Sequence, residues 1–509
     1  MPSLVSPRRR VGIGTWLRLC AVAAACQVGH HAQGQYTRTD HFDGSVATLK
    51  RCVLPSDARE HHALIVSLRA LRDPSLKPFF ESLTRSSNWS SRVDGILGLA
   101  ELSESRDIDP NLVQRLTSAE DRSTAVRNAV GFRLLTPATI RQLLKMPDWP
   151  SLDRVVLNAE LNRLGEKVDE TDLRAAAADQ SEEIAALACA LLIAHGDEDV
   201  WNAFEARLAR RPPEVRNLVL QEMAKAVLLY DIVGAVDPML RLIEDESITT
   251  ATRMMAIGSA LALKGPSGQE AWKRLVQKER SQTALVRAGL QLMSQTTPIE
   301  PGLGSAIRNG EPLVEAIADA IEANASGDPE ALAGALIVVV DRANRQSAEW
   351  AVQRAKALPT AQGGRVWRHL LERFLTVPDN TLALGAVVLD AARRLAIADP
   401  AAIETLISAA KDEPQVQEIL VLALCDAATP EAARIARAVR GSFTRRGDSL
   451  AILAVARGQP SLDPDTLREL GIIGAGGGDL DPTLLVQAAW LFARHSGRAD
   501  QALSQINPQ

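Results

Sequence analysis

The chain has 509 residues, of which 46% are hydrophobic but only 4% are aromatic, and its formal net charge is −5. A mildly acidic chain lacks the basic footprint of a general nucleic-acid-binding protein, and few aromatic residues leave few platforms for stacking bases. We therefore expect no nucleic-acid partner.

The first 34 residues resemble a bacterial export signal. Three consecutive arginines at 8–10 precede an apolar stretch at 16–28, and residues 32–34 place small residues at the two positions that a signal peptidase recognises. This pattern predicts cleavage between Gly34 and Gln35 and a periplasmic or secreted mature protein. The apolar stretch is interrupted and too short for a comfortable membrane span.

A second interpretation of the same segment involves Cys26. It follows three alanines, an arrangement similar to a bacterial lipoprotein cleavage site, although an alanine stands where leucine is usual. Lipidation of Cys26 would anchor the protein to the envelope, and only in that case do we expect contact with a membrane. Three cysteines follow the predicted cleavage site, so no framework of disulfides holds the fold, and those at 189 and 425 are expected in the core.

Helix-start patterns recur about once per 30 residues in the first half of the chain. The clearest copies begin at Val126, Val215 and Val286, each followed by an arginine, and weaker copies begin at Val93, Leu152, Ile184 and Thr252. Shorter helical patterns lie between them, so the unit is a pair of helices. A period in this range indicates a stacked repeat protein, in which each unit packs on its neighbours.

The division of the chain follows from this period and its interruptions. Helix starts beyond the clear repeats are marked by Asp-Pro or Thr-Pro pairs, in which the first residue caps the helix and proline occupies its first turn. We predict a signal peptide at 1–34, a tail or packed lead-in at 35–54, clear repeats at 55–297, a break or hinge at 298–312, divergent helical repeats at 313–473, a glycine-rich linker at 474–481 and C-terminal capping helices at 482–509.

The copies at 126, 215 and 286 resemble HEAT repeats of the short, bilin-lyase type. The first copy also has Asp121 five residues before its valine, as in the family pattern, whereas the other two copies lack that aspartate. The resemblance implies an all-α, right-handed α-solenoid of antiparallel helix pairs, with the motif helices lining the concave side. It also implies that the motif arginines form a structural ladder with acids of adjacent units, at Arg127, Arg216, Arg253 and Arg287.

We find no local catalytic, metal or cofactor motif in the sequence. Adjacent histidines such as His61 and His62 point about 100° apart on a helix and cannot easily reach one ion. The glycine run at 474–478 lacks the preceding strand that a phosphate-binding loop needs. Tryptophans at 201, 272, 350 and 367 are expected in the helix-pair core rather than at a binding surface. We therefore expect no cofactor, no metal and no assigned catalytic residue.

These observations favour an exported, non-catalytic scaffold that binds a protein or peptide on its concave face. Two alternatives remain open: a lyase-like or maturation accessory enzyme, whose site would combine residues from several repeats, and a structural envelope component anchored through Cys26.

Overall fold

The computed structural model describes residues 41–53, 58–279, 281–294, 298–342, 345–376, 381–441 and 443–506. Over these residues every regular element is a helix, which confirms the predicted all-α class. Residues Asp40 to Gln509 form one compact unit. Gly34, Gln35 and Cys26, on which the cleavage and lipidation predictions depend, lie outside the described residues.

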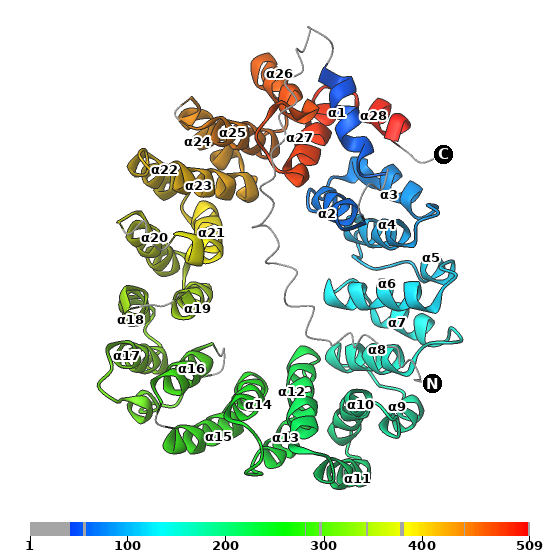
Figure 1. Cartoon of the computed structure of the whole chain (residues 1–509), viewed down its shortest axis with the longest axis vertical. Coiled ribbons are helices and arrows are strands. Elements are labelled where there is room, and N and C mark those ends of the chain that lie inside the picture. Colours follow the sequence, from blue (N-terminus) through cyan, green and yellow to red (C-terminus); the bar gives the residue numbers. More distant parts are fainter. Residues whose placement is uncertain are drawn as a thin grey trace, which may run out of the picture. The chain divides into compact units, whose positions relative to one another are not determined.

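The helices of this unit form two layers, as Figure 1 shows. Each helix pair places one helix in each layer, and consecutive pairs pack side by side. The inner layer contains α2 (Ala58–Arg69), α4 (Trp89–Leu102), α6 (Ala119–Gly131), α8 (Ser151–Arg163), α10 (Glu182–Ala194), α12 (Pro213–Leu229), α14 (Thr250–Leu263), α16 (Gln282–Met293), α19 (Arg345–Ala355), α21 (Thr381–Ala398), α23 (Pro414–Ala427), α25 (Arg445–Gly458) and α27 (Pro482–His495).

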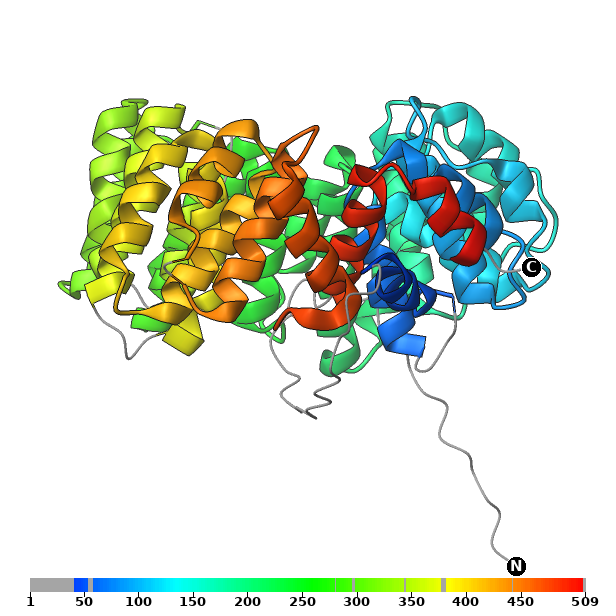
Figure 2. The same ribbon diagram turned by 90° about the horizontal axis from the view of Figure 1, so that it is seen from above.

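The outer layer is built from shorter helices in the first half and longer ones in the second. It contains α3 (Lys77–Leu83), α5 (Pro110–Gln114), α7 (Pro137–Leu144), α9 (Glu170–Ala177), α11 (Glu198–Ala209), α13 (Val236–Leu242), α15 (Gly265–Lys278), α17 (Pro312–Ser326), α18 (Pro329–Arg342), α20 (Thr360–Thr376), α22 (Pro400–Ala409), α24 (Pro430–Val439), α26 (Pro464–Ile472) and α28 (Ala499–Ile506). Helices of the second half, yellow to orange in Figure 2, stand side by side.

The predicted capping pairs begin helices as expected. Proline occupies the first position of α5, α7, α18, α22, α24, α26 and α27. At α5, for example, the Asp109 carboxylate accepts a hydrogen bond from the Asn111 amide at 2.9 Å. The cap satisfies an amide that has no partner inside the helix, and proline at this position loses no hydrogen bond.

The repeat register differs from the predicted one at the copy beginning at Val126. The inner helices α4 to α16 begin at residues 89, 119, 151, 182, 213, 250 and 282, which are 30, 32, 31, 31, 37 and 32 residues apart. Val126 is the eighth residue of α6, whereas Val215 is the third of α12. Arginine instead recurs as the fourth residue of five inner helices, at Arg92, Arg122, Arg154, Arg216 and Arg253. The apolar face of a helix repeats every turn, so a valine-arginine pair one turn further along matched the same pattern.

The predicted break at 298–312 is an irregular but packed connection. It contains the short helix η4 (Gly304–Ile307), and Ile299, Leu303 and Ile307 are buried. Helix α17 packs directly on α16 across this connection, so the array continues. The inner helices α19 to α27 begin at 345, 381, 414, 445 and 482, intervals of 36, 33, 31 and 37 residues, so the helix-pair period persists where the arginine signature is absent.

The two ends of the array pack against each other. Helix α1 (His41–Lys50) lies against α27 and α28, and α2 also packs on α27 (Figure 1). Trp490 of α27 is fully buried and donates from Nε1 to Asp73 at 2.9 Å, just before η2 (Pro74–Leu76), and Arg494 lies 3.5 Å from the same carboxylate. Gln487 donates to the Ser67 carbonyl at 3.0 Å. The unit is therefore a closed array of helix pairs, and α1 packs where its two ends meet.

The predicted glycine-rich linker at 474–481 is wrong in its first residues, which continue α26 as the helical turn η6 (Ile473–Gly477). This turn packs between α1 and α27. A Cβ at Gly474 would lie 2.8 Å from both the Ala489 Cα and the Ser45 Oγ. Glycine is needed here because the backbones approach closely. A glycine-rich sequence can reflect either such close packing or a flexible linker, and composition alone does not distinguish the two.

Candidate binding surface

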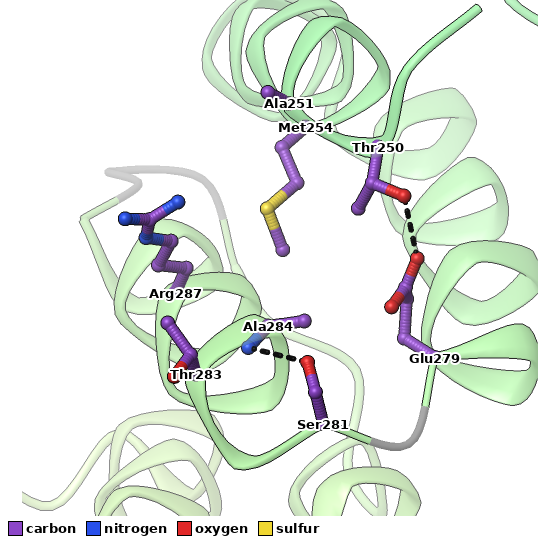
Figure 3. Close-up of a pocket in the computed structure, with 8 residues that line it drawn as sticks. All are labelled: Thr250, Ala251, Met254, Glu279, Ser281, Thr283, Ala284 and Arg287. Carbon is purple, nitrogen blue, oxygen red and sulfur yellow. Dashed lines mark hydrogen bonds between the residues drawn. The ribbon is translucent and has the colours of Figure 1, made fainter.

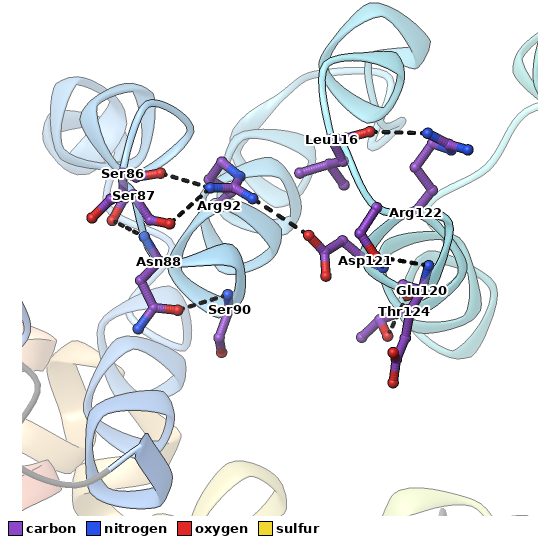
Figure 4. A network of polar contacts seen from close by, with 11 residues as sticks. Ser86, Ser87, Asn88, Ser90, Arg92, Leu116, Glu120, Asp121, Arg122 and Thr124 are labelled. Atoms are coloured by element: carbon purple, nitrogen blue, oxygen red, sulfur yellow. Dashed lines mark hydrogen bonds and ion pairs between the residues drawn. The ribbon is translucent and has the colours of Figure 1, made fainter.

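Charged side chains of the first half form a ladder between successive inner helices. Figure 4 shows Arg92 of α4 contacting the Ser86 and Ser87 carbonyls at 3.0 Å and Asp121 of α6 at 3.4 Å. Arg127 of α6 donates from Nε to Asp153 of α8 at 2.7 Å. Asp153 is fully buried, whereas the Arg127 side chain is 37% exposed. Each pair links one repeat to the next, and the buried partner is the acid.

Further arginine–carboxylate pairs lie along the ladder, with the acid buried at Glu160 but the arginine the more buried partner at Arg69. Glu160 is fully buried and accepts from Arg133 at 3.0 Å and from Arg163 at 2.6 Å and 2.8 Å. Arg69 at the end of α2 makes a bidentate contact with Glu101 at 2.8 Å and 3.0 Å and also reaches Asp94 at 3.3 Å. Bidentate arginine–carboxylate pairs combine charge with fixed geometry, so they hold the register between neighbouring helices.

The histidine pair of α2 is part of this packing. His62 Nδ1 lies 2.9 Å from Asp94, and this hydrogen bond raises the pKa of His62 despite the opposing effect of burial. His61 is buried. Over the described part of the chain, no group of three or more His, Cys, Asp or Glu side chains is placed to hold a metal ion.

The four arginines predicted as ladder residues have different surroundings. Arg127 pairs with Asp153 at 2.7 Å, and Arg216 pairs with Asp245 at 2.5 Å. Arg253 donates to the Asp245 carbonyl oxygen at 2.7 Å rather than to a carboxylate. Arg287 is exposed and contacts no carboxylate among the described residues.

Arg287 lines an open depression of about 300 Å³ between the first turns of α14 and α16 (Figure 3). Its other lining residues are Thr250, Ala251, Met254, Glu279, Ser281, Thr283 and Ala284. Thr250 donates to Glu279 at 2.7 Å, and Ser281 caps α16 through the Ala284 amide at 3.3 Å (Figure 3). The depression thus combines the Arg287 guanidinium, which makes no ion pair with a described residue, with hydroxyl groups, the Glu279 carboxylate and part of the Met254 side chain.

Several predicted core residues are confirmed. The tryptophans at 201, 272, 350 and 367 are at most 9% exposed. Trp272 donates to the Ala288 carbonyl at 2.8 Å, and Trp367 donates to the Val352 carbonyl at 3.2 Å. The described cysteines at 52, 189 and 425 are buried and free, and burial raises the pKa of Cys189 to about 12. These side chains pack the helix pairs and are not available on the surface.

Sequence reasoning missed the arginines of the second half. Arg354 of α19 is half-buried and donates to the Asn324 side chain, and burial alone lowers its pKa. Arg393 of α21 donates to Asp426 of α23 at 2.6 Å. Their spacing from the helix start differs from that of the first-half arginines, so the valine-arginine pattern could not find them. A search for arginine at any position of the inner helices would have found these residues.

Comparison with known proteins adds little to this picture. No protein-family model matches the chain, and no curated protein sequence matches it. Among solved structures, it is similar to a chain of the full-length AP-3 complex, a homology model in an intermediate open conformation. The two chains are 13% identical over 92% of this chain and 93% of that one, with a TM-score of 0.33.

The helix pairs themselves define the present chain as a helical-repeat protein, an α-solenoid. No described helix is long and apolar enough to cross a membrane.

Proposed function

We propose that this protein is an exported scaffold that binds a protein or peptide partner on the inner layer of its helices. The observation that supports it is the depression between α14 and α16, where the exposed side chains of Arg287 and Thr283 lie beside Met254, which is 8% exposed, and Glu279. A surface that offers apolar contact and an unpaired donor side by side has the composition of a peptide-binding site.

The repeats themselves are proposed to be of the short HEAT type. Support comes from the intervals of 30 to 37 residues between inner helices on either side of the longer gap between α16 and α19, and from the arginine that recurs as the fourth residue of five of them. Export is proposed from the arginines, apolar stretch and small residues of segment 1–34. Mass spectrometry of the mature N-terminus tests it: a chain beginning at Gln35 supports export by cleavage after Gly34, whereas a lipidated Cys26 supports the anchored alternative.

Site-specific photo-crosslinking tests the binding role. A photoreactive amino acid at Thr283, which is exposed in the depression, is compared with one at Gln277, which is exposed on the outer helix α15. We expect a defined crosslinked species from position 283 that is absent from position 277. Equal crosslinking from both positions, or none from either, contradicts binding at the inner layer.

A further inference from the structure

The inner layer is divided by charge into two stretches. The helices α6, α8, α10 and α12 contain six basic and eight acidic residues. The next four inner helices, α14, α16, α19 and α21, also contain six basic residues, all arginines, but only two acidic ones, Glu349 and Asp390. The number of bases is the same, so the difference comes from missing carboxylates.

This difference decides which arginines are neutralised inside the chain. In the first stretch, five of the six basic residues lie within an ion pair: Arg127, Arg154, Arg163, Arg216 and Lys225, at 2.7, 2.7, 2.6, 2.5 and 2.6 Å. The sixth, Arg122, donates to the Leu116 carbonyl at 3.1 Å. In the second stretch, Arg393 and Arg394 are paired with Asp426 and Asp390.

The other four arginines of the second stretch have no carboxylate partner among the described residues. They are Arg253, Arg287, Arg345 and Arg354, and Arg287 and Arg345 are exposed. Burial lowers the pKa of Arg354, and no nearby acid offsets that effect. Arg253 and Arg354 donate to a backbone carbonyl and to Asn324, respectively. Arg287 and Arg345 are therefore the residues of this stretch whose positive charge is available for a partner.

We infer that the inner side of α14, α16, α19 and α21, here called the arginine face, binds an acidic peptide segment of a protein partner, with one apolar side chain seated against Met254. This inference rests on the proposed scaffold function and specifies the chemistry of the partner. Unpaired guanidinium groups bind carboxylates with two parallel hydrogen bonds. The depression of about 300 Å³ beside Arg287 lies at the small end of ligand pockets. Met254 and Ala284, each 8% exposed, give it a small apolar surface, and its one described carboxylate, Glu279, accepts a hydrogen bond from Thr250 at 2.7 Å.

A peptide fits the arginine face better than a single-stranded nucleic acid. Nucleic-acid grooves combine basic residues with exposed aromatic side chains on which bases stack. The single aromatic residue in these four helices is Trp350, which is 9% exposed. An acidic peptide needs the arginines and an apolar contact, and both are present.

The test uses a phage-displayed library of random peptides, panned on the full chain, with the recovered peptides then synthesised with a fluorescein label. The double variant Arg287→Ala/Arg345→Ala removes two exposed arginines of the arginine face, neither of which makes an ion pair with a described residue. Its matched control, Arg274→Ala/Arg365→Ala, removes two arginines that are 55% and 52% exposed on the outer helices α15 and α20. Both variants change the net charge equally.

We expect the recovered peptides to be enriched in Asp and Glu around one apolar residue. The arginine-face variant should weaken their affinity about tenfold, because charge-assisted hydrogen bonds are lost, and the outer control should change it less than about twofold. Affinity should also fall as salt is raised.

Recovered peptides that are neutral or basic, or acidic peptides weakened equally by both variants, overturn the inference and leave the scaffold function standing. An oligothymidylate that competes as well as the peptides also overturns it. If panning on the wild-type chain recovers no binding peptide, the proposed function fails together with the inference.

Discussion

The buried pair between Arg127 and Asp153 makes an asymmetric prediction about the ladder. Asp153 is fully buried and accepts from Arg127 Nε at 2.7 Å and from the Ser123 hydroxyl. Arg127→Met leaves a buried carboxylate without its cation, and such a loss costs about 3–5 kcal/mol. Asp153→Asn leaves an arginine that is 37% exposed and free to turn toward water, so we expect a smaller loss of about 1–3 kcal/mol.

Hydrogen exchange read by mass spectrometry over α6 and α8 is the appropriate assay, because a long repeat array need not unfold in one step and opens locally. Since 1.4 kcal/mol corresponds to a tenfold change, Arg127→Met should reduce protection there by about 10²-fold or more. The control Arg141→Met removes one partner of the pair between Arg141 and Glu166, which are 49% and 37% exposed, and should cost at most about 1 kcal/mol. A larger effect from Asp153→Asn than from Arg127→Met would refute the argument that the acid is the buried partner whose charge matters.

Three further predictions concern the array ends and the core. Burial opposes ionisation of Asp73, but hydrogen bonds from Ser75 and Trp490 outweigh it and lower its pKa. The stabilisation from the ionised carboxylate is present above the ordinary carboxyl pKa of about 4 and is lost as pH falls through the lowered value. Acid should therefore increase hydrogen exchange in α27, and Asp73→Asn should abolish this increase. Gly474→Val should separate η6 from α1 and α27, since even a Cβ would lie 2.8 Å from Ser45 Oγ of α1 and 2.8 Å from the Ala489 Cα of α27, and limited proteolysis should then cut the first helices earlier than in wild type. Cys189, with its pKa raised to about 12 by burial, should resist alkylation at pH 8 in the native protein, and modification within minutes by mass spectrometry would contradict its placement in the core.

The fold class was predictable because it depends on local signals. Each Asp-Pro or Thr-Pro pair acts within one turn of its own helix, so the helix starts at Pro110 and Pro464 follow from two adjacent residues. The register was less secure, because the apolar face repeats every turn and a pattern shifted by a turn, as at Val126, fits almost as well.

The pairing of charges could be predicted only in outline. The acid partners of Arg127 and Arg92, Asp153 and Asp121, lie 26 and 29 residues away, whereas that of Arg154, Asp172, lies 18 away. Helix rotation decides which acid each arginine reaches. The same reasoning assigned one role to Arg127 and Arg287, although the second has an exposed environment in the structure. Sequence spacing indicates where an arginine lies along a helix, and it does not indicate which carboxylate the neighbouring repeat supplies.

Closure of the array was outside the reach of sequence periodicity for a physical reason. In an open solenoid each repeat contacts its neighbours only, and terminal repeats need a polar outer face. Here the last inner helix carries Trp490, an apolar side chain of the kind that a terminal cap should avoid, and buries it against residues more than 400 positions earlier in the chain. The first and last repeats therefore stabilise each other, and the energy of the array gains a term that joins its ends. Because this closure fixes the curvature of the inner layer, a partner would bind a surface that is already ordered. The entropy cost of ordering the protein on binding is therefore reduced.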